Sequence, residues 1–451
     1  ITSYSQGDYI TTMDFDPFGR LEEQTTGSVF NMRYGFDDAN NIEFREDVRT
    51  SQKEEFSYDN LNRLTGIEYY LNGTHITAED FSIGYSNDGN ISSKTDVATI
   101  INYGENGTGP HALSSVEEPV STFRATPQAI EYTCFNKVSE ICDTIAQDTT
   151  LRLEFTYGLQ HQRVKMIKKR NGIVEQIKYY NGDYEEDSTS TGTKKYHYIS
   201  APNGLTAIFV SEGSADTLYH VLTDHLGSLT GIINEGNDSV QYFSYSAWGV
   251  PRDADNWTDA FEGDLFCGRG FTSHEHLPEF NLINMNGRVY DPVLARFLSV
   301  DPFVQFPGLA DGYNRYSYVM NNPLRFVDPT GYLTQDEFYA MIDDLLNSED
   351  GGFWSEETGT YYFSSGGEAY RFGQSYINYY SGRGLSTRTT YQISFHGLPF
   401  IFGRNVLAHH SYLWIKFNPN FNIEIVQQES KIDFSDQYWF QSLESLTGDI
   451  K

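Results

Sequence analysis

The first hundred residues repeat one pattern of apolar and polar positions four times. Each copy has an aromatic residue, a cluster of Asp or Asn, a Gly or Asn suited to a positive φ, a polar residue and an aliphatic one. The copies start 21, 22 and 27 residues apart and read FDPFGRL, FDDANNI, YDNLNRL and YSNDGNI, from Phe15, Phe36, Tyr58 and Tyr85. Such a turn between an aromatic and an aliphatic strand end is typical of a β-hairpin. The spacing predicts one hairpin per repeat, packed against its neighbours.

The same style of strand and turn continues through the middle of the chain. Aromatic segments at 178–185 and 197–199 alternate with polar loops. The Ser- and Thr-rich stretch at 187–193 is short, so it is interpreted as a hairpin tip and not as a domain linker. These segments extend the predicted sheet beyond the four clear repeats.

The pattern changes after Tyr332. Apolar residues between 334 and 347 recur at spacings of three and four, which predicts a helix, and Thr334 with Glu337 fits a capping box at its start. Strands are predicted at 391–395, 411–417 and 421–427, and a last helix at 435–446. The tail is therefore predicted to be a separate, small α+β domain.

Composition narrows the classes of function. The chain has 451 residues, of which 39% are hydrophobic and 15% aromatic, so it is expected to fold and to be rich in half-buried sheet. Its 62 acidic and 31 basic residues give a formal charge of −31, which disfavours nucleic acid as a partner of the sheet region. No run approaches the roughly 20 apolar residues of a membrane span. Cys134 and Cys142 fit either a small disulfide loop or free thiols.

The residues from Tyr219 to Tyr332 resemble the core module of the RHS, or YD-repeat, proteins, and the Tyr58-Asp59 pair with Arg63 resembles their repeat. The matching motifs occur in the family's order and read DHLGS (Asp224–Ser228), YSAWG (Tyr245–Gly249), RGFTSHEHL (Arg269–Leu277), LINMNGRVYDP (Leu282–Pro292), RFLSVDP (Arg296–Pro302), NRYSYVMNNP (Asn314–Pro323) and DPTGY (Asp328–Tyr332). The chain is similar in this way to polymorphic toxins that carry a variable C-terminal effector.

The resemblance implies a mainly β fold, in which hairpin repeats wind into a spiral β shell that a small α+β domain follows. By position, the repeats would occupy residues 1–218, the RHS-associated core 219–332, and the effector-like domain 333–451. The sequence starts with Ile and not with Met, so it is interpreted as a piece of a longer secreted chain.

The resemblance also implies an aspartic self-cleavage site at the end of the core. The paired carboxylates would be Asp301 and Asp328, the nearby basic residue Arg296, and the scissile bond Tyr332–Leu333. Two carboxylates held close cannot both ionise cheaply, so one stays protonated as the general acid while the other activates water. The alternative is that both Asp residues only cap turns. Many family members carry Leu or Trp at the position of Tyr332.

Two other patterns invite chemistry in the sheet region. His274 and His276 would share one face of a strand at a distance that suits a metal ion, but a role in stabilising the shell is simpler, and no metal or cofactor is predicted. The many aromatic rings suggest carbohydrate binding, against which stacking within the shell is favoured.

The tail carries a polar cluster that includes Arg404, His409 and His410. His410 precedes the apolar strand at 411–415, a place where a catalytic His is found in permuted papain-like peptidases. No Cys follows Cys267, so the nucleophile of such a peptidase would have to be Ser, be degenerate or lie beyond Lys451. A metal-independent nuclease that uses His with Arg or Lys is the competing enzyme. A tail without catalysis is the third alternative.

The function predicted from these patterns is the C-terminal part of a bacterial, secreted RHS-type toxin whose shell sequesters its effector. The implied partners are a secretion machinery and an immunity protein for the tail, with the chain itself a monomer. A cell-surface adhesion or recognition protein, or a carbohydrate-binding repeat protein, would share the same repeats. Localisation is expected to be secreted or at the cell surface.

Overall fold

The computed structural model describes residues 2–332, except for 106, 122, 124–127, 146–148, 160, 202–203 and 303–309, and beyond them the seven strands of one sheet. The chain folds into two compact units, Ile1–Thr156 with Arg163–Phe338 and Tyr157–Gln162 with Tyr339–Lys451. The described residues are mainly β, as predicted. The boundaries proposed at residues 218 and 332 stay predictions.

The first unit begins with a twelve-stranded antiparallel sheet in which strands neighbour one another in nearly chain order, β8 pairing with β7 at the side. Its strands are β1 (Ser3–Gln6), β2 (Tyr9–Phe15), β3 (Leu21–Thr26), β4 (Phe30–Phe36), β5 (Ile42–Asp47), β6 (Gln52–Tyr58), β7 (Leu64–Leu71), β8 (Thr74–His75), β9 (Phe81–Tyr85), β10 (Ile91–Lys94), β11 (Ala98–Tyr103) and β12 (Leu113–Pro119), with a short 3₁₀ helix η1 (Thr77–Glu79).

A second antiparallel sheet of eleven strands follows in strict chain order. It contains β13 (Ala129–Tyr132), β14 (Val138–Ile145), β15 (Thr149–Tyr157), β16 (Arg163–Arg170), β17 (Ile173–Asn181), β18 (Tyr184–Thr189), β19 (Gly192–Ala201), β20 (Gly204–Glu212), β21 (Ala215–Thr223), β22 (Leu229–Asn234) and β23 (Val240–Tyr242). The stretch at 187–193 forms the β18–β19 hairpin, as predicted.

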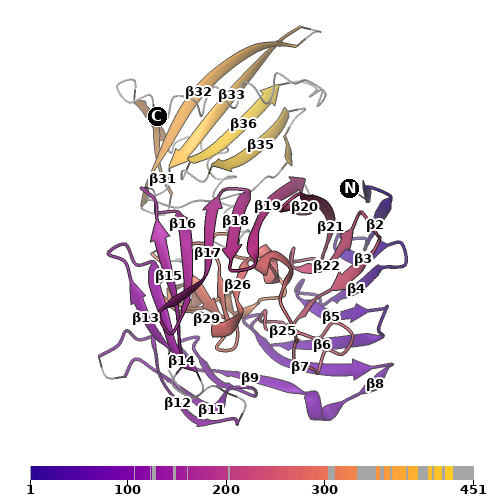
Figure 1. Ribbon diagram of the computed structural model, residues 1–451, viewed down its shortest axis with the longest axis vertical. Coiled ribbons are helices and arrows are strands. Elements are labelled where there is room, and N and C mark those ends of the chain that lie inside the picture. The colour runs from indigo at the N-terminus through magenta and orange to yellow at the C-terminus, as the bar shows by residue number, and fades with distance from the viewer. Residues whose placement is uncertain are drawn as a thin grey trace. The chain divides into compact units, whose positions relative to one another are not determined.

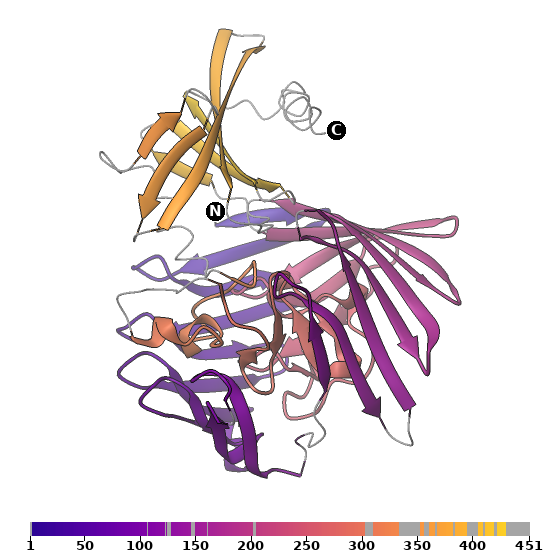
Figure 2. The same ribbon diagram turned by 90° about the vertical axis from the view of Figure 1, so that its left-hand side faces the viewer.

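The residues from Phe243 to Tyr332, here called the core segment, form short strands and 3₁₀ turns between the two sheets (Figure 1, Figure 2). These elements are β24 (Ser244–Tyr245), β25 (Pro251–Arg252), η2 (Phe266–Gly268), η3 (Phe271–Ser273), β26 (Glu275–Leu277), η4 (Pro278–Phe280), β27 (Leu282–Asn284), β28 (Val289–Asp291), β29 (Arg296–Phe297), η5 (Ala310–Tyr313) and η6 (Val319–Asn321). The sheets and the core segment together make the β shell of the first unit.

In the second unit, the structure describes one seven-stranded antiparallel sheet of order β30-β31-β32-β33-β36-β35-β34. Its strands are β30 (Gly352–Ser355), β31 (Thr360–Ser365), β32 (Glu368–Ser381), β33 (Gly384–Ser394), β34 (Asn405–Ala408), β35 (Ser411–Asn418) and β36 (Asn422–Glu429). The helices predicted at 334–347 and 435–446 lie outside the described residues.

The four predicted turns connect β2 to β3, β4 to β5, β6 to β7 and β9 to β10, and they share one geometry. In the third turn, Asp59 Oδ1 accepts the backbone N–H groups of Leu61 at 2.9 Å and Arg63 at 3.0 Å. The fifth position of every copy has the predicted positive φ, with values of 82°, 65°, 60° and 77° at Gly19, Asn40, Asn62 and Gly89. The Asp therefore satisfies the turn's amides, and Gly or Asn takes the left-handed conformation at low cost.

Neighbouring repeats are tied together by their aromatic residues. Tyr85 donates its hydroxyl hydrogen bond to the carbonyl of Leu64 at 2.7 Å, and Tyr58 does the same to Ile42 at 2.8 Å. The guanidinium of Arg63 lies 4.4 Å from the centre of the Tyr85 ring. These contacts show a structural use for the repeat aromatics and favour it over sugar recognition.

Several further turns have the same backbone hydrogen bonds but were not recognised in the sequence, and three of them serve as examples. They start at Thr133, Asp224 and Ser246, each donating to the residue four positions on at 2.8, 3.1 and 2.9 Å. The Asp224 turn follows β21, where Gly227 has the positive φ. The repeat thus extends through the second sheet and into the core segment, where sequence alone did not reveal it.

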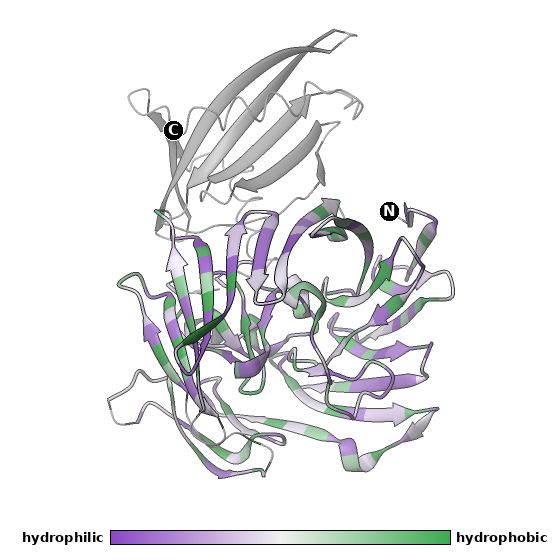
Figure 3. Ribbon diagram, viewed as in Figure 1, coloured by the Kyte–Doolittle hydropathy of each residue, from purple (hydrophilic) through white to green (hydrophobic). Residues whose placement is uncertain are grey.

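Buried residues alternate with more exposed ones along strands of both sheets, such as β6 and β15, and the hydropathy of the ribbon varies along the strands (Figure 3). Two buried ion networks join the sheets to the core segment. On the first sheet, Glu54 contacts Arg45 at 2.7 Å and Arg252 at 2.6 Å. On the second sheet, Lys178 contacts Glu275 of β26 at 2.9 Å. Because all these groups are buried, each network needs its partners in place.

Candidate self-cleavage site

The structure brings Asp301 and Asp328 together around one arginine. Arg288 Nη2 lies 2.8 Å from Asp301 Oδ2 and 3.2 Å from Asp328 Oδ2, so the two oxygens are separated by at most the sum of these distances. All three side chains are 1% exposed. Two carboxylates 27 residues apart in sequence are therefore neighbours in a site without bulk water.

Arg288 also holds the backbone around this pair. Its Nε donates to the carbonyl oxygen of Gly331 and its Nη1 to that of Arg315, the latter at 3.0 Å. Its guanidinium carbon lies 3.5 Å from the centre of the Phe297 ring. The planar fork of Arg288 is thus fixed by several partners, which is the kind of use that distinguishes Arg from Lys.

Asp328 has a different task at each carboxylate oxygen. Its Oδ1 accepts the backbone N–H of Tyr332 at 2.9 Å and the N–H and hydroxyl of Thr330 at 3.3 and 3.2 Å, which closes the loop Asp328–Tyr332. Asp328 therefore caps a turn, as the alternative interpretation of the sequence proposed. Its second oxygen, Oδ2, faces Arg288, which also contacts Asp301.

Gly331 is required by the shape of this loop. Its φ of +74° lies in the left-handed region, and a Cβ atom there would sit 2.2 Å from the carbonyl oxygen of Met285. Any side chain would therefore collide with backbone. The glycine lets the chain pass close to β27 just before Tyr332.

Burial decides the electrostatics of the pair. It raises the pKa of Asp328, and the nearby charge of Arg288, which lowers that pKa, does not offset it. Two carboxylates held this close repel one another when both are charged, which favours a proton retained on one of them. One carboxylic acid next to one carboxylate is the arrangement that general acid and base catalysis needs.

The cation that contacts both carboxylates is Arg288 rather than Arg296, the basic residue placed there by the sequence. Arg296, on β29, donates to the carbonyl oxygen of His111 and lies 4.4 Å from the ring centre of Tyr103. It therefore joins β29 to the first sheet. Arg288 belongs to the LINMNGRVYDP motif, but its contact with both carboxylates was not predicted from the sequence.

Other candidate residues fall in different places. Tyr332 is described and is 6% exposed. Leu333, Arg404, His409 and His410 lie outside the described residues, so the scissile bond and the tail cluster stay predictions. Cys134, Cys142 and Cys267 are free thiols.

The rings of His274 and His276 are engaged within the core segment. His274 Nδ1 lies 2.7 Å from the Thr272 hydroxyl and its Nε2 3.2 Å from the Pro329 carbonyl, while His276 Nε2 accepts the N–H of Phe271 at 3.0 Å. Burial lowers the pKa of His274 to about 4 and that of His276 to about 3. Over the part of the chain that the structure describes, no group of three or more His, Cys, Asp and Glu is arranged to hold a metal.

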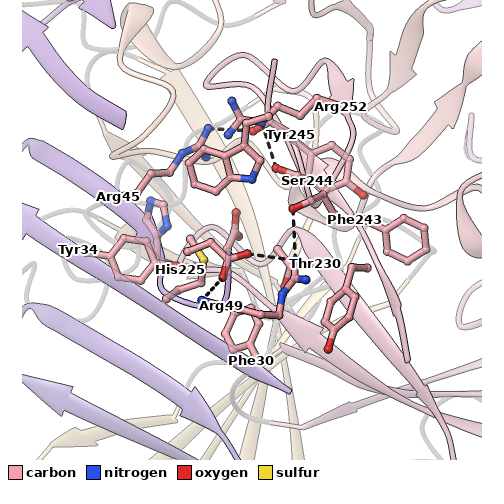
Figure 4. Close-up of a pocket in the computed structure, with 16 residues that line it drawn as sticks. Phe30, Tyr34, Arg45, Arg49, His225, Thr230, Phe243, Ser244, Tyr245 and Arg252 are labelled. Carbon is pink, nitrogen blue, oxygen red and sulfur yellow. Dashed lines mark hydrogen bonds and ion pairs between the residues drawn. The ribbon is translucent and has the colours of Figure 1, made fainter. Parts of the chain in front are cut away.

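A pocket between the first sheet and the core segment is a second place to look for chemistry (Figure 4). The arginines that line it are already paired: Arg45 and Arg252 share Glu54, and Arg49 contacts Asp47 at 3.2 Å. These pairs stabilise the sheet contact and leave little charge for a ligand. The carboxylate pair at Arg288 is the stronger candidate site.

Hairpins joined by a repeated Asp-centred turn, wound around a core segment that ends in paired aspartates, define a YD-repeat β shell. No family model matches the chain. The tRNA nuclease WapA of Bacillus subtilis (strain 168) is 28% identical over 182 residues, which are 39% of this chain and 7% of that protein. Salivary gland surface protein 1 of Aedes aegypti is 26% identical over 217 residues, 45% of this chain and 6% of that protein.

The fold has a solved counterpart. The crystal structure of TcdB2-TccC3 matches with a TM-score of 0.56 at 16% identity, over 73% of this chain and 19% of that one. The chain matches less than a tenth of the length of WapA and of salivary gland surface protein 1. The repeats, the shell fold and these relatives together support an RHS/YD-repeat shell. None of the helices in the described residues is long and apolar enough to span a membrane.

Proposed function

We propose that this chain is the C-terminal part of a secreted RHS-type toxin that encapsulates its effector in the shell and cleaves itself between Tyr332 and Leu333. The observation that carries the proposal is the buried group Asp301–Arg288–Asp328, which binds the backbone immediately before that bond. A turn cap alone would not require a second buried carboxylate at the same guanidinium.

The proposed chemistry is a single hydrolysis. One carboxylate accepts a proton from a water molecule whose oxygen attacks the carbonyl carbon of Tyr332. The protonated partner gives its proton to the nitrogen of Leu333 as the peptide bond breaks, which leaves a carboxylate on Tyr332 and an amine on Leu333. Arg288 holds both acids, and the bonds to Tyr332 N and Gly331 O fix the peptide for attack.

Intact mass of the purified 451-residue chain tests this. The wild type is expected to give two fragments, residues 1–332 and 333–451, while Asp328→Asn and Asp301→Asn stay at 51.4 kDa or are cut at least about 100-fold more slowly. Asp291→Asn is the matched control, because Asp291 also caps a turn of the core segment, through Val293 and Leu294, but does not contact Arg288. A wild type that remains whole, or an Asp328→Asn chain cut at the wild-type rate, contradicts self-cleavage.

The remaining parts of the proposal concern the tail and its partners. The shell would be a monomer that carries residues 333–451, exported by a secretion machinery, while an immunity protein protects the producer. Expression of residues 333–451 in a bacterial cytoplasm is expected to arrest growth, and co-expression of the specific immunity protein to restore it. Growth equal to that with an empty vector contradicts an effector role. The tail's activity, nuclease or peptidase, stays a prediction.

A cell-surface recognition protein is the second candidate. It is favoured by the name of one relative, a salivary gland surface protein, whose matched residues are 45% of this chain. If the tail is harmless in the cytoplasm and the uncut chain binds intact cells, recognition is the better account. Loss of that binding on a glycan array after substitution of exposed aromatic residues would extend it to carbohydrates.

A further inference from the structure

The side chain of Tyr332 lies in a seat made by residues from two distant parts of the chain. Gly287 forms its floor: a Cβ atom there would lie 2.1 Å from Tyr332 Cε2 and 2.3 Å from its Cδ2. Two cationic side chains flank the ring, with Arg288 Cζ 5.7 Å and Lys137 Nζ 5.9 Å from its centre. Both distances fall within the range of cation–π attraction.

Lys137 reaches this place from the turn between β13 and β14 of the second sheet. It is only 3% exposed, and its Nζ lies 3.5 Å from the carbonyl oxygen of Asn286, beside Gly287. Burial, and after it the charge of Arg163, lowers the pKa of Lys137 to about 7. A lysine is rarely buried, because removing its charge from water is costly. Its contact with the Tyr332 ring is one interaction that offsets this cost.

We propose that Lys137, Gly287 and Arg288 form a subsite that holds the aromatic ring of Tyr332 and so positions the Tyr332–Leu333 bond at Asp301 and Asp328. This inference rests on the proposed self-cleavage and adds the side chain that the site selects. Lys137 is a positioning residue here, because it would act on the reacting bond through the ring of Tyr332 and the backbone at Asn286.

The subsite has a defined chemical preference. It accepts an aromatic ring at residue 332, because only a ring face attracts both cations, and the absence of a side chain at residue 287 leaves room for it. An aliphatic residue would fill the space without the attraction. A peptide whose side chain is loosely held spends less time in the reactive geometry, and misplacement by about 1 Å can cost on the order of 100-fold in rate.

Cleavage rates of full-length variants test the subsite. Lys137→Met is expected to slow cleavage about 10-fold, whereas Lys137→Arg, which keeps a cation, restores a rate within about threefold of the wild type. Lys94→Met is the matched control: Lys94 is 2% exposed and its Nζ lies 4.7 Å from the Phe81 ring, but in the first sheet. A Lys137→Met chain that is cut at the wild-type rate overturns the inference.

A double-mutant cycle separates ring recognition from general support of the fold. Tyr332→Phe is expected to cleave like the wild type, and Tyr332→Leu about 10-fold more slowly. In the Tyr332→Leu chain, Lys137→Met should cause no further loss, because the ring it acts on is gone. An equal loss in both backgrounds means that Lys137 acts on something other than the ring, and the inference fails.

A second readout does not depend on self-cleavage. In the full-length Asp301→Asn chain, chymotrypsin can cut after Tyr332 only when the ring leaves its seat. Lys137→Met in that background is expected to raise the rate of cutting after Tyr332 about 10-fold, and neither Lys137→Arg nor Lys94→Met should do so. An unchanged rate overturns the subsite even where self-cleavage is observed. A raised rate supports the subsite even if the wild-type chain proves to remain whole, which would contradict only the proposed function.

Discussion

The repeats and the core segment are both rich in aromatic residues and turns, but they differ in the residues that take left-handed backbone conformations. In the repeats, the left-handed backbone positions fall on residues that adopt them cheaply, such as Gly19 and Asn62. In the core segment, two β-branched residues are among those that take them, with a φ of 48° at Thr272 and 42° at Val319. Such conformations cost about 1–3 kcal/mol each and persist only where the surroundings impose them.

The difference shows where the molecule concentrates its chemistry. The repeats gain stability from one inexpensive unit used many times, and some of their ion pairs, such as that of Glu23 with Arg33, are partly exposed. The core segment carries the strain, the buried histidines and the carboxylate pair. Strained backbone is thus found close to the candidate site, and the regular sheets supply stability that offsets it.

Breaking the link between the two regions should have the largest effect. Glu54→Ala leaves Arg45 and Arg252 buried without their carboxylate, so we expect the free energy of unfolding to fall by about 3–5 kcal/mol. Urea denaturation of the uncleaved Asp301→Asn chain measures it. The control Glu23→Ala, on the same sheet, should cost less than about 1 kcal/mol. Equal losses would show that the buried network is no more important than a surface pair.

Acid should weaken the core segment through its histidines. Burial lowers the pKa of His274 to about 4 and of His276 to about 3, whereas an unfolded histidine titrates near 6.5. Their contribution is therefore complete above pH 6.5 and is lost as the pH falls toward 4, on the order of 2–3 kcal/mol for His274. Urea midpoints of the Asp301→Asn chain at pH 7 and 4.5 should differ more than those of its His274→Gln/His276→Gln variant. Parallel midpoints would refute the assignment.

The smallest expected effect separates conformational cost from crowding. Gly19 has a φ of +82° and open space around a Cβ atom, so Gly19→Ala should lower stability by only about 1 kcal/mol. The same substitution at Gly331 meets the carbonyl of Met285 at 2.2 Å and should cost clearly more. Melting temperatures of both variants in the Asp301→Asn background test this. Similar shifts would mean that the loop before Tyr332 adapts as freely as a repeat turn.

Sequence predicted those parts of the fold that local chemistry specifies. The repeat turns were readable because an aromatic, an Asp and a Gly or Asn recur at fixed offsets, and each has a local reason to be there. The turns at Thr133 and Ser246 were not, since a hydroxyl there accepts the backbone N–H that an Asp carboxylate accepts in three of the four clear copies. The described part of the tail is sheet, and its predicted helices remain untested.

The candidate site was half readable for the same reason. Asp301 and Asp328 are recognisable in the sequence because each precedes a Pro within a motif. Arg288 and Lys137 come close to the site only through tertiary packing. Arg296 was the nearer arginine in sequence, and β29 carries it to the first sheet instead. Lys137 lies 195 positions before Tyr332, so no spacing rule could connect the two.

The tyrosine hydroxyls that tie the hairpins together all point backward along the chain. Tyr58 bonds to Ile42, Tyr85 to Leu64, and Tyr103 to Ile91. During synthesis, each hairpin thus leaves the ribosome with its final bond unmade and receives it only when the next tyrosine emerges. Loss of one of these tyrosine hydroxyls would therefore weaken the preceding turn as well as its own hairpin, because the bond it makes belongs to both.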